Sequence, residues 1–125
     1  MNRISILLVE DYADTRAFIQ LMLEDAGFDV ITKEDGAEAL EFLAQTRPSI
    51  VLTDLMMPNV SGLELIERMR NKAELADIPI IAMTAYGSGP IREAKQAGAN
   101  AILRKPASSE LIASTVRQLL SPSAS

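Results

Sequence analysis

Short runs of aliphatic residues alternate with amphipathic segments along the whole chain, and this alternation constrains the fold more than any other feature. The runs are short and nearly continuous, as in strands buried on both faces of a sheet. Strands that alternate with helices form a parallel sheet with right-handed crossovers and helices on both faces. The sequence therefore predicts an open α/β sheet. The predicted strands are Ile4–Val9, Phe28–Thr32, Ser49–Thr53, Ile78–Met83 and Asn100–Leu103.

The segments between these runs carry helix signals. Asp14 is predicted to cap the first helix, which should end before Gly27. Capping boxes at 35–38 and 61–64 predict the starts of the second and third helices. The predicted inward face of the first helix is Phe18, Ile19, Met22, Leu23 and Ala26.

Two further helices are predicted in the last third of the chain. Pro90 follows the glycine-rich 87–90 loop and suits the first turn of a helix that runs to about Ala97. Ser108 is predicted to cap the last helix. A basic cluster near the end of the third helix, Arg68, Arg70 and Lys72, is interpreted as a solvated face.

Composition narrows the possible chemistry. The 125 residues match one domain, predicted over residues 1–120 with a tail or linker stub at 121–125. A net charge of −5 argues against direct nucleic-acid binding. The absence of cysteine and histidine excludes thiol nucleophiles, zinc–thiolate sites and an intrinsic histidine base. No apolar run could span a membrane, and Met1–Arg3 is too short for a signal peptide, so a cytoplasmic location is expected.

Polar residues follow several of the predicted strands. Glu10 and Asp11 follow the first, Asp54 ends the third, Thr84 follows the fourth and Lys105 lies just after the fifth. Because functional crevices of open α/β sheets lie at the carboxyl ends of the strands, these side chains should converge. Clustered carboxylates hold raised pKa values or bind a cation, and oxygen ligands favour Mg²⁺. A metal, a carboxylate nucleophile, a lysine and a hydroxyl suit phosphoryl transfer.

The order and spacing of these residues resemble one known family. The motifs are Glu10-Asp11, Asp54 to Pro58 with Gly62, Thr84-Ala85 and Lys105-Pro106. From Ile4 to about Leu120, the chain resembles the receiver domain of two-component response regulators. The resemblance implies a doubly wound, flavodoxin-like (CheY-like) sheet in the order 2-1-3-4-5 with five helices.

The resemblance also implies roles for these residues. Asp54 would accept a phosphoryl group from a phosphohistidine on a partner, so the domain would be a signalling switch and not a conventional enzyme. Glu10, Asp11, Asp54 and the backbone carbonyl of Met56 would hold Mg²⁺ (or Mn²⁺), Glu10 mostly through a water. Lys105 and Thr84 would bind phosphoryl oxygens. This would switch the 84–90 loop and the face formed by the fourth helix, fifth strand and fifth helix.

The implied partners are a sensor histidine kinase or a histidine phosphotransfer protein, and a downstream effector or output domain whose identity the sequence does not give. The domain would be a monomer or a phosphorylation-dependent dimer, without membrane or nucleic-acid contacts of its own.

The chain departs from the family pattern where many receivers carry an aromatic switch residue three positions before the lysine. This chain has Ile102 there, and a β-branched side chain is stiff and has no ring to swing inward. Tyr86 is a possible substitute, and we expect Tyr86 and Met56 together to tune the phosphate lifetime.

Two alternative functions stay open on the sequence. A flavodoxin-like cofactor carrier would need a phosphate-cradling loop after the first strand, but Glu10 to Asp14 would repel a phosphate. A pseudo-receiver, an interaction module that is never phosphorylated, conflicts with the complete acidic, threonine and lysine set but fits the departure at Ile102.

Overall fold

The computed structural model describes residues 3–57, 59–85 and 88–121. In this part of the chain, five strands form one parallel sheet in the order β2-β1-β3-β4-β5, which confirms the predicted fold. The strands are β1 Ser5–Val9, β2 Asp29–Lys33, β3 Ile50–Asp54, β4 Ile80–Thr84 and β5 Ala101–Arg104.

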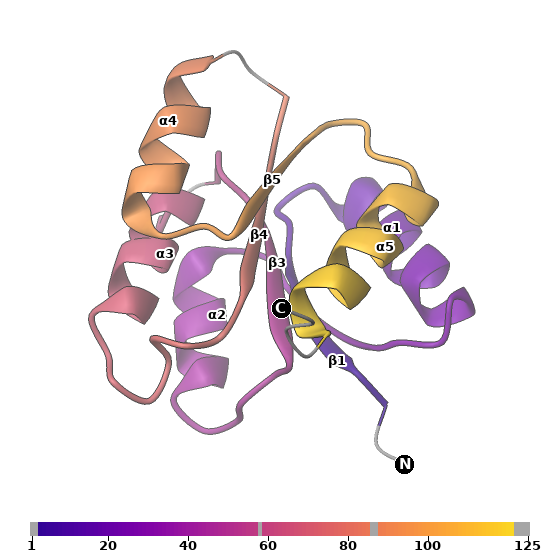
Figure 1. Cartoon of the computed structure of the whole chain (residues 1–125), viewed down its shortest axis with the longest axis horizontal. Helices are drawn as coiled ribbons and strands as arrows, with labels where there is room; N and C mark the ends of the chain where they lie inside the picture. Colours follow the sequence, from indigo (N-terminus) through magenta and orange to yellow (C-terminus); the bar gives the residue numbers. More distant parts are fainter. Residues whose placement is uncertain (1–2, 58, 86–87, 122–125) are drawn as a thin grey trace.

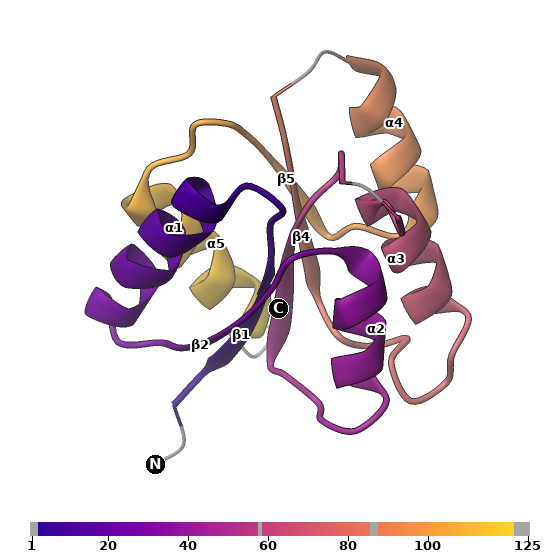
Figure 2. The same cartoon turned by 180° about the vertical axis from the view of Figure 1, so that it is seen from behind.

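The helices among the described residues cover both faces of the sheet. α1 and α5 lie on one face, and α2, α3 and α4 lie on the other (Figure 1). Figure 2 shows the same layers from behind, with α2 and α3 side by side. The helices are α1 Ala13–Asp25, α2 Gly36–Leu43, α3 Gly62–Arg70, α4 Ser88–Ala97 and α5 Ser109–Leu120.

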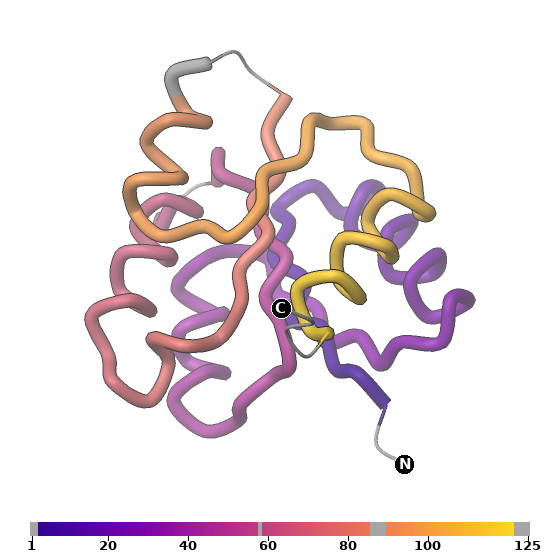
Figure 3. Tube along the Cα trace, viewed as in Figure 1, coloured from indigo at the N-terminus to yellow at the C-terminus, as the bar shows by residue number. Residues whose placement is uncertain are grey.

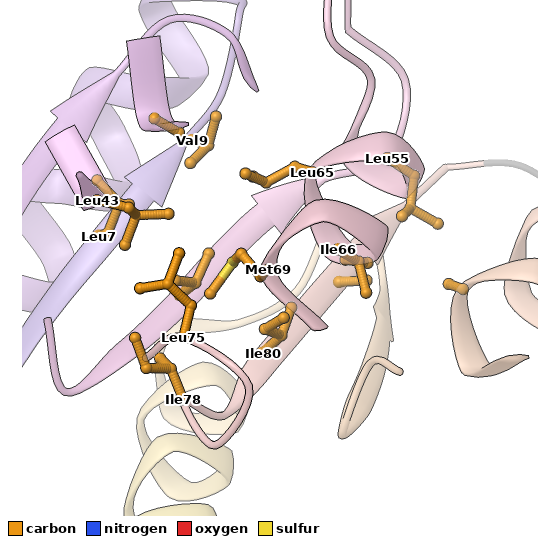
Figure 4. Close-up of a cluster of buried hydrophobic side chains, with 14 residues drawn as sticks. Leu7, Val9, Leu43, Leu55, Leu65, Ile66, Met69, Leu75, Ile78 and Ile80 are labelled. Carbon is orange, nitrogen blue, oxygen red and sulfur yellow. The ribbon is translucent and has the colours of Figure 1, made fainter. Parts of the chain in front are cut away.

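The sheet separates two apolar clusters. Alternate residues of β1 face opposite sides, so that Leu7 and Val9 join the cluster beneath α2 and α3, while Ile6 and Leu8 join the cluster beneath α1 and α5. Figure 4 shows Met69 of α3 among the buried side chains of the first cluster. All five residues of β3 and all five of β4 are buried. The two central strands are therefore fully enclosed, and their one charged residue, Asp54, stands at the end of β3.

The register aligns the carboxyl ends of the central strands. Val9 at the end of β1 pairs with Thr53, and Asp54 at the end of β3 pairs with Met83. Because β3, β4 and β5 are parallel neighbours, their carboxyl ends lie at the same end of the sheet (Figure 3). Residues that follow different strands consequently meet at one edge.

Several predicted boundaries and caps differ from the structure. β4 begins two residues later than predicted because the Ile78 N–H bonds to the Leu75 carbonyl in the preceding turn, at 3.2 Å. α1 begins at Ala13, after Tyr12 and not at Asp14, which lies in the first turn. Phe18, expected to face inward, is 61% exposed.

The other predicted caps are confirmed. Asp35, Ser61 and Ser108 each accept a hydrogen bond from a backbone N–H of the first turn that follows. The capping box of α2 differs from the usual pattern in one hydrogen bond. The Glu38 carboxylate accepts from the N–H of Glu34 and not from that of the N-cap residue Asp35.

The prediction that Arg70 belongs to a solvated face is wrong. Its guanidinium donates to the carbonyls of Gly98, Ala76 and Ile78 and to the side chain of Asn100, at 2.8 to 3.1 Å. Gly98 has a φ of 122°, and a Cβ there would crowd the Arg70 side chain. Burial lowers the pKa of Arg70, although Asp77 opposes this effect. Arg70 thus ties the end of α3 to the start of β4 and the end of α4.

No helix in the described ranges is long and apolar enough to cross a membrane.

The Arg70 contacts predict that Arg70 contributes much more to the free energy of unfolding than the neighbouring Arg68 does. Arg70→Ala should lower the free energy of unfolding by about 2–3 kcal/mol, because it leaves several backbone carbonyls without their donor. Arg68→Ala removes an exposed ion pair with Glu64 one turn away and should cost about 0.5 kcal/mol or less. Urea denaturation of both variants measures the difference, and equal losses would contradict the role given to Arg70.

Candidate functional site

Three carboxylates meet at the carboxyl edge of the sheet. Glu10 and Asp11 directly follow β1, and Asp54 is the last residue of β3. Because β1 and β3 are neighbours, one carboxylate oxygen from each of the three lies within 4.8 Å of the others. Glu10 and Asp54 are only 1% and 7% exposed, whereas Asp11 is exposed. The structure therefore brings the predicted acidic residues together in a site that opens on the Asp11 side.

Lys105 supplies a positive charge to this cluster. Its Nζ donates to Glu10 Oε1 at 2.7 Å and to Asp54 Oδ2 at 3.2 Å. Its backbone N–H bonds to the Thr84 carbonyl at 2.9 Å, which fixes the chain beside the end of β4. Lys105 was expected to bind a phosphoryl oxygen, and in the structure its partners are two carboxylates, of which Glu10 is the nearer.

Burial and the hydrogen bond between Glu10 and Lys105 shift the pKa values of both residues in opposite directions. Burial raises the pKa of Glu10, and the neighbouring Asp54 charge adds to this, while the Lys105 hydrogen bond opposes it. Burial lowers the pKa of Lys105, but the hydrogen bond to Glu10 and the charge of Asp54 outweigh burial, so the pKa lies above its ordinary value. The site therefore resists deprotonation of the lysine and disfavours a second buried negative charge.

The backbone around Asp54 is closely packed. The Asp54 carbonyl accepts a bond from the Thr53 hydroxyl at 2.9 Å, and the Leu55 N–H bonds to the Met83 carbonyl at 3.1 Å. Gly62 lies against this backbone, where a Cβ would overlap the Asp54 carbonyl. A glycine at this position is therefore required by the approach of α3 to the end of β3.

The structure describes three of the other predicted site residues, and they differ in their surroundings. Thr84 is buried at the end of β4. Met56 is 55% exposed, and its N–H points to Asp54 Oδ1 at 3.5 Å. Ile102 is half-buried and packs against the cluster beneath α2 to α4. Tyr86 lies outside the described residues.

Two contacts of Glu10 were missed by sequence reasoning. Arg16 on α1 donates to the Glu10 carbonyl at 2.8 Å, and the Tyr12 N–H donates to Glu10 Oε2 at 3.2 Å. An arginine one turn into the helix after an acidic pair is the only sequence signal for the first contact. Together they hold both the backbone and the carboxylate of Glu10.

The donor set fits a hard divalent cation. Glu10, Asp11 and Asp54 offer carboxylate oxygens, the ligands that Mg²⁺ prefers. Three neighbouring acids, two of them in contact with one lysine, keep an excess of negative charge when ionised, and a divalent cation would neutralise it.

Comparisons with known proteins agree with this geometry. Residues 6–117 match the model of the response regulator receiver domain. The chain is 35% identical to the response regulator Rre1 of Synechocystis sp. over 94% of its length, and spans 52% of that protein. It is 32% identical to the polar-differentiation response regulator DivK of Brucella anthropi, covering 93% of this chain and 95% of that one.

One of the similar solved structures can be compared with this chain at the site as well as in the fold. The receiver domain of the sensor histidine kinase PA1611 from Pseudomonas aeruginosa superposes with a TM-score of 0.89 at 28% identity, over 95% of this chain and 98% of that chain. That structure has a magnesium ion coordinated in its active-site cleft. The chain therefore belongs to the receiver domain family of response regulators, whose members are signalling switches.

The raised pKa of Glu10 predicts a pH-dependent cost of burying its charge. The folded state holds the Glu10 proton more tightly than the unfolded state, in which the pKa is near 4.5. The contribution of Glu10 to stability is therefore greatest below pH 4.5 and is lost as the pH rises through its folded pKa.

The free energy of unfolding of the wild type, minus that of Glu10→Gln, should thus fall between pH 4.5 and neutrality, by about 1.4 kcal/mol for each unit of pKa difference. Urea denaturation in the presence of a chelator measures this difference. Glu41→Gln, on the exposed face of α2, controls for loss of a surface charge. A difference that rises with pH would contradict the prediction.

Proposed function

We propose that the chain is a phosphoacceptor domain of a two-component phosphorelay, in which Asp54 takes a phosphoryl group from a phosphohistidine on a partner. The observation that carries this proposal is the position of Asp54 at the edge of the sheet, between Lys105 and two further carboxylates. Its backbone packs against Gly62 and its carboxylate accepts from Lys105, so both are placed, which suits an in-line reaction that depends mainly on positioning.

In the proposed reaction, a carboxylate oxygen of Asp54 attacks the phosphorus atom. A phosphorus–oxygen bond forms, the phosphorus–nitrogen bond to the donor imidazole breaks, and the electron pair returns to the imidazole nitrogen. Mg²⁺ held by Glu10, Asp11, Asp54 and the Met56 carbonyl would neutralise charge on the phosphoryl oxygens. No histidine is needed in this chain, because the partner supplies it.

Lys105 and Thr84 are proposed to receive the phosphoryl group. The Lys105 ammonium already contacts Asp54 and would turn to a phosphoryl oxygen, while the Thr84 hydroxyl would bind another. Because the Lys105 N–H bonds to the Thr84 carbonyl, the two residues would move together. The change would reach the 84–90 segment and the face formed by α4, β5 and α5.

The proposed partners are a sensor histidine kinase or a histidine phosphotransfer protein, with an output domain or separate effector downstream. The half-length match to Rre1 and the nearly full-length match to DivK fit an excised receiver and a single-domain regulator equally well. A receiver domain over 1–120 and a cytoplasmic location both remain predictions.

Phosphorylation of Asp54 is tested with a small phosphodonor and Mg²⁺. Intact-mass measurement should detect a labile gain of one phosphoryl group in the wild type and none in Asp54→Asn. Asp77→Asn, which changes an exposed aspartate in an ion pair with Arg47, is the matched control and should be labelled normally. Labelling that persists in Asp54→Asn would overturn the assignment, and an unlabelled wild type would favour the pseudo-receiver.

The exposed Met56 side chain predicts an effect on phosphate lifetime. Met56→Asn replaces an apolar side chain beside Asp54 with a polar one that can orient water, so autodephosphorylation should become several-fold faster. Tyr86→Ala should also change the rate, and Leu21→Asn, an exposed apolar site on α1, should not. Following loss of the phosphorylated mass over time measures the rates. Unchanged rates in both Met56→Asn and Tyr86→Ala would contradict the prediction.

A further inference from the structure

The connection between β3 and α3 is attached to the start of α2. Asn59 Nδ2 donates to Asp35 Oδ2 at 3.1 Å, and the Gly36 N–H donates to the Val60 carbonyl at 3.2 Å. These two hydrogen bonds join segments 24 residues apart, and we call them the loop latch. None of these four residues is a proposed ligand or catalytic group.

The residues that form the loop latch are of types that its backbone conformation and close contacts require. Asn59 has a φ of 65°, a left-handed conformation that asparagine tolerates better than most residues. A Cβ at Gly36 would overlap the Val60 carbonyl, so only glycine permits this approach. Asp35 uses both oxygens, since Oδ1 caps the Glu38 N–H at 2.9 Å while Oδ2 accepts from Asn59.

The latch lies on the same connection as Met56. At the near end, Asp54 and Leu55 are fixed by β4 and by Gly62, whose N–H bonds to the Leu55 carbonyl at 3.1 Å. At the far end, Ser61 caps α3 through the Glu64 N–H at 3.2 Å. Met56 lies between Leu55 and the latch, so its backbone is placed from both sides.

We propose that the Asp35–Asn59 bond is a positioning contact that holds the Met56 carbonyl ready for the cation and thereby sets the Mg²⁺ affinity of the site. This inference rests on the proposed function, because it takes the Met56 carbonyl as a ligand. Mg²⁺ demands near-ideal octahedral geometry, so a ligand on a loosely held loop has to be ordered when the ion binds. Because the loop latch orders the loop when the protein folds, the free-energy cost of ordering it does not reduce the affinity for the ion.

Two substitutions break the bond from opposite ends while keeping the local backbone. Asn59→Gly removes the side-chain amide, and glycine accepts the positive φ. Asp35→Ser keeps a favourable N-cap for α2 but is too short to accept from Asn59 as well. The double variant completes a thermodynamic cycle, which separates loss of the bond from the loss of charge at Asp35.

Isothermal titration calorimetry with MgCl₂ measures the dissociation constant of the wild type and the three variants. Each single substitution should weaken Mg²⁺ binding by about three- to tenfold, the loss expected for one hydrogen bond. Adding Asp35→Ser to Asn59→Gly should weaken it much less than adding Asp35→Ser to the wild type. Urea denaturation without Mg²⁺ should reveal native-like folding in all of them.

The outcomes separate this inference from the proposed function. If the wild type binds Mg²⁺ and the single variants bind it equally well, the positioning role of the Asp35–Asn59 bond is overturned and the proposed function stays intact. The same holds if the thermodynamic cycle shows no coupling between the two substitutions. Variants that lose stability but not Mg²⁺ affinity would give the bond a purely structural role and also overturn the inference. Wild type that does not bind Mg²⁺ would overturn the metal site itself, and the latch with it.

Discussion

The Lys105 ammonium, held between the Glu10 and Asp54 carboxylates, is the interaction on which the arrangement of this edge depends. Glu10 is 1% exposed, and a buried carboxylate is costly unless a partner neutralises it. One ammonium does not balance Glu10, Asp11 and Asp54 together, so the site retains negative charge when all are ionised. The excess of negative charge that disfavours this cluster in the bare protein would attract a divalent cation, and the bound cation would in turn attract the anionic phosphoryl group.

Only the topology of the sheet can assemble these groups, because 95 residues separate Glu10 from Lys105. Placing β1 beside β3 puts the acidic pair next to Asp54, and β4 then separates Asp54 from β5, which leads to Lys105. Apolar clusters cover both faces of β3, so a charged residue has no place within this strand. Asp54 accordingly stands at its end. The reversal of strand order between β1 and β3 is where open α/β sheets place their sites.

The sequence predicted the strands and the converging residues, since each depends on a local signal: an apolar run, and the polar residue that ends it. The strand order was predicted only through the resemblance to the receiver family, because no local signal reports it. Prediction from the sequence failed where individual hydrogen bonds decide. The Tyr12 N–H bonds to the Glu10 carboxylate two residues back, and α1 starts after Tyr12, so that Asp14 lies in the first turn and is not the cap. The role of Arg70 depends on carbonyls that α4 and β4 bring to it, and no local pattern of charge reports them.

Glu10 also links the two chemical tasks proposed for the site. Its carboxylate remains ionised at low cost only while Lys105 or a cation balances its charge. If Lys105 turned toward a phosphoryl group on Asp54, Glu10 would lose its nearer partner while remaining buried among the same neighbours. A cation at the Asp11 side would replace that partner, so cation binding and release of Lys105 would favour each other. In the proposed reaction, the lysine would then bind the phosphoryl group without leaving an isolated buried charge behind.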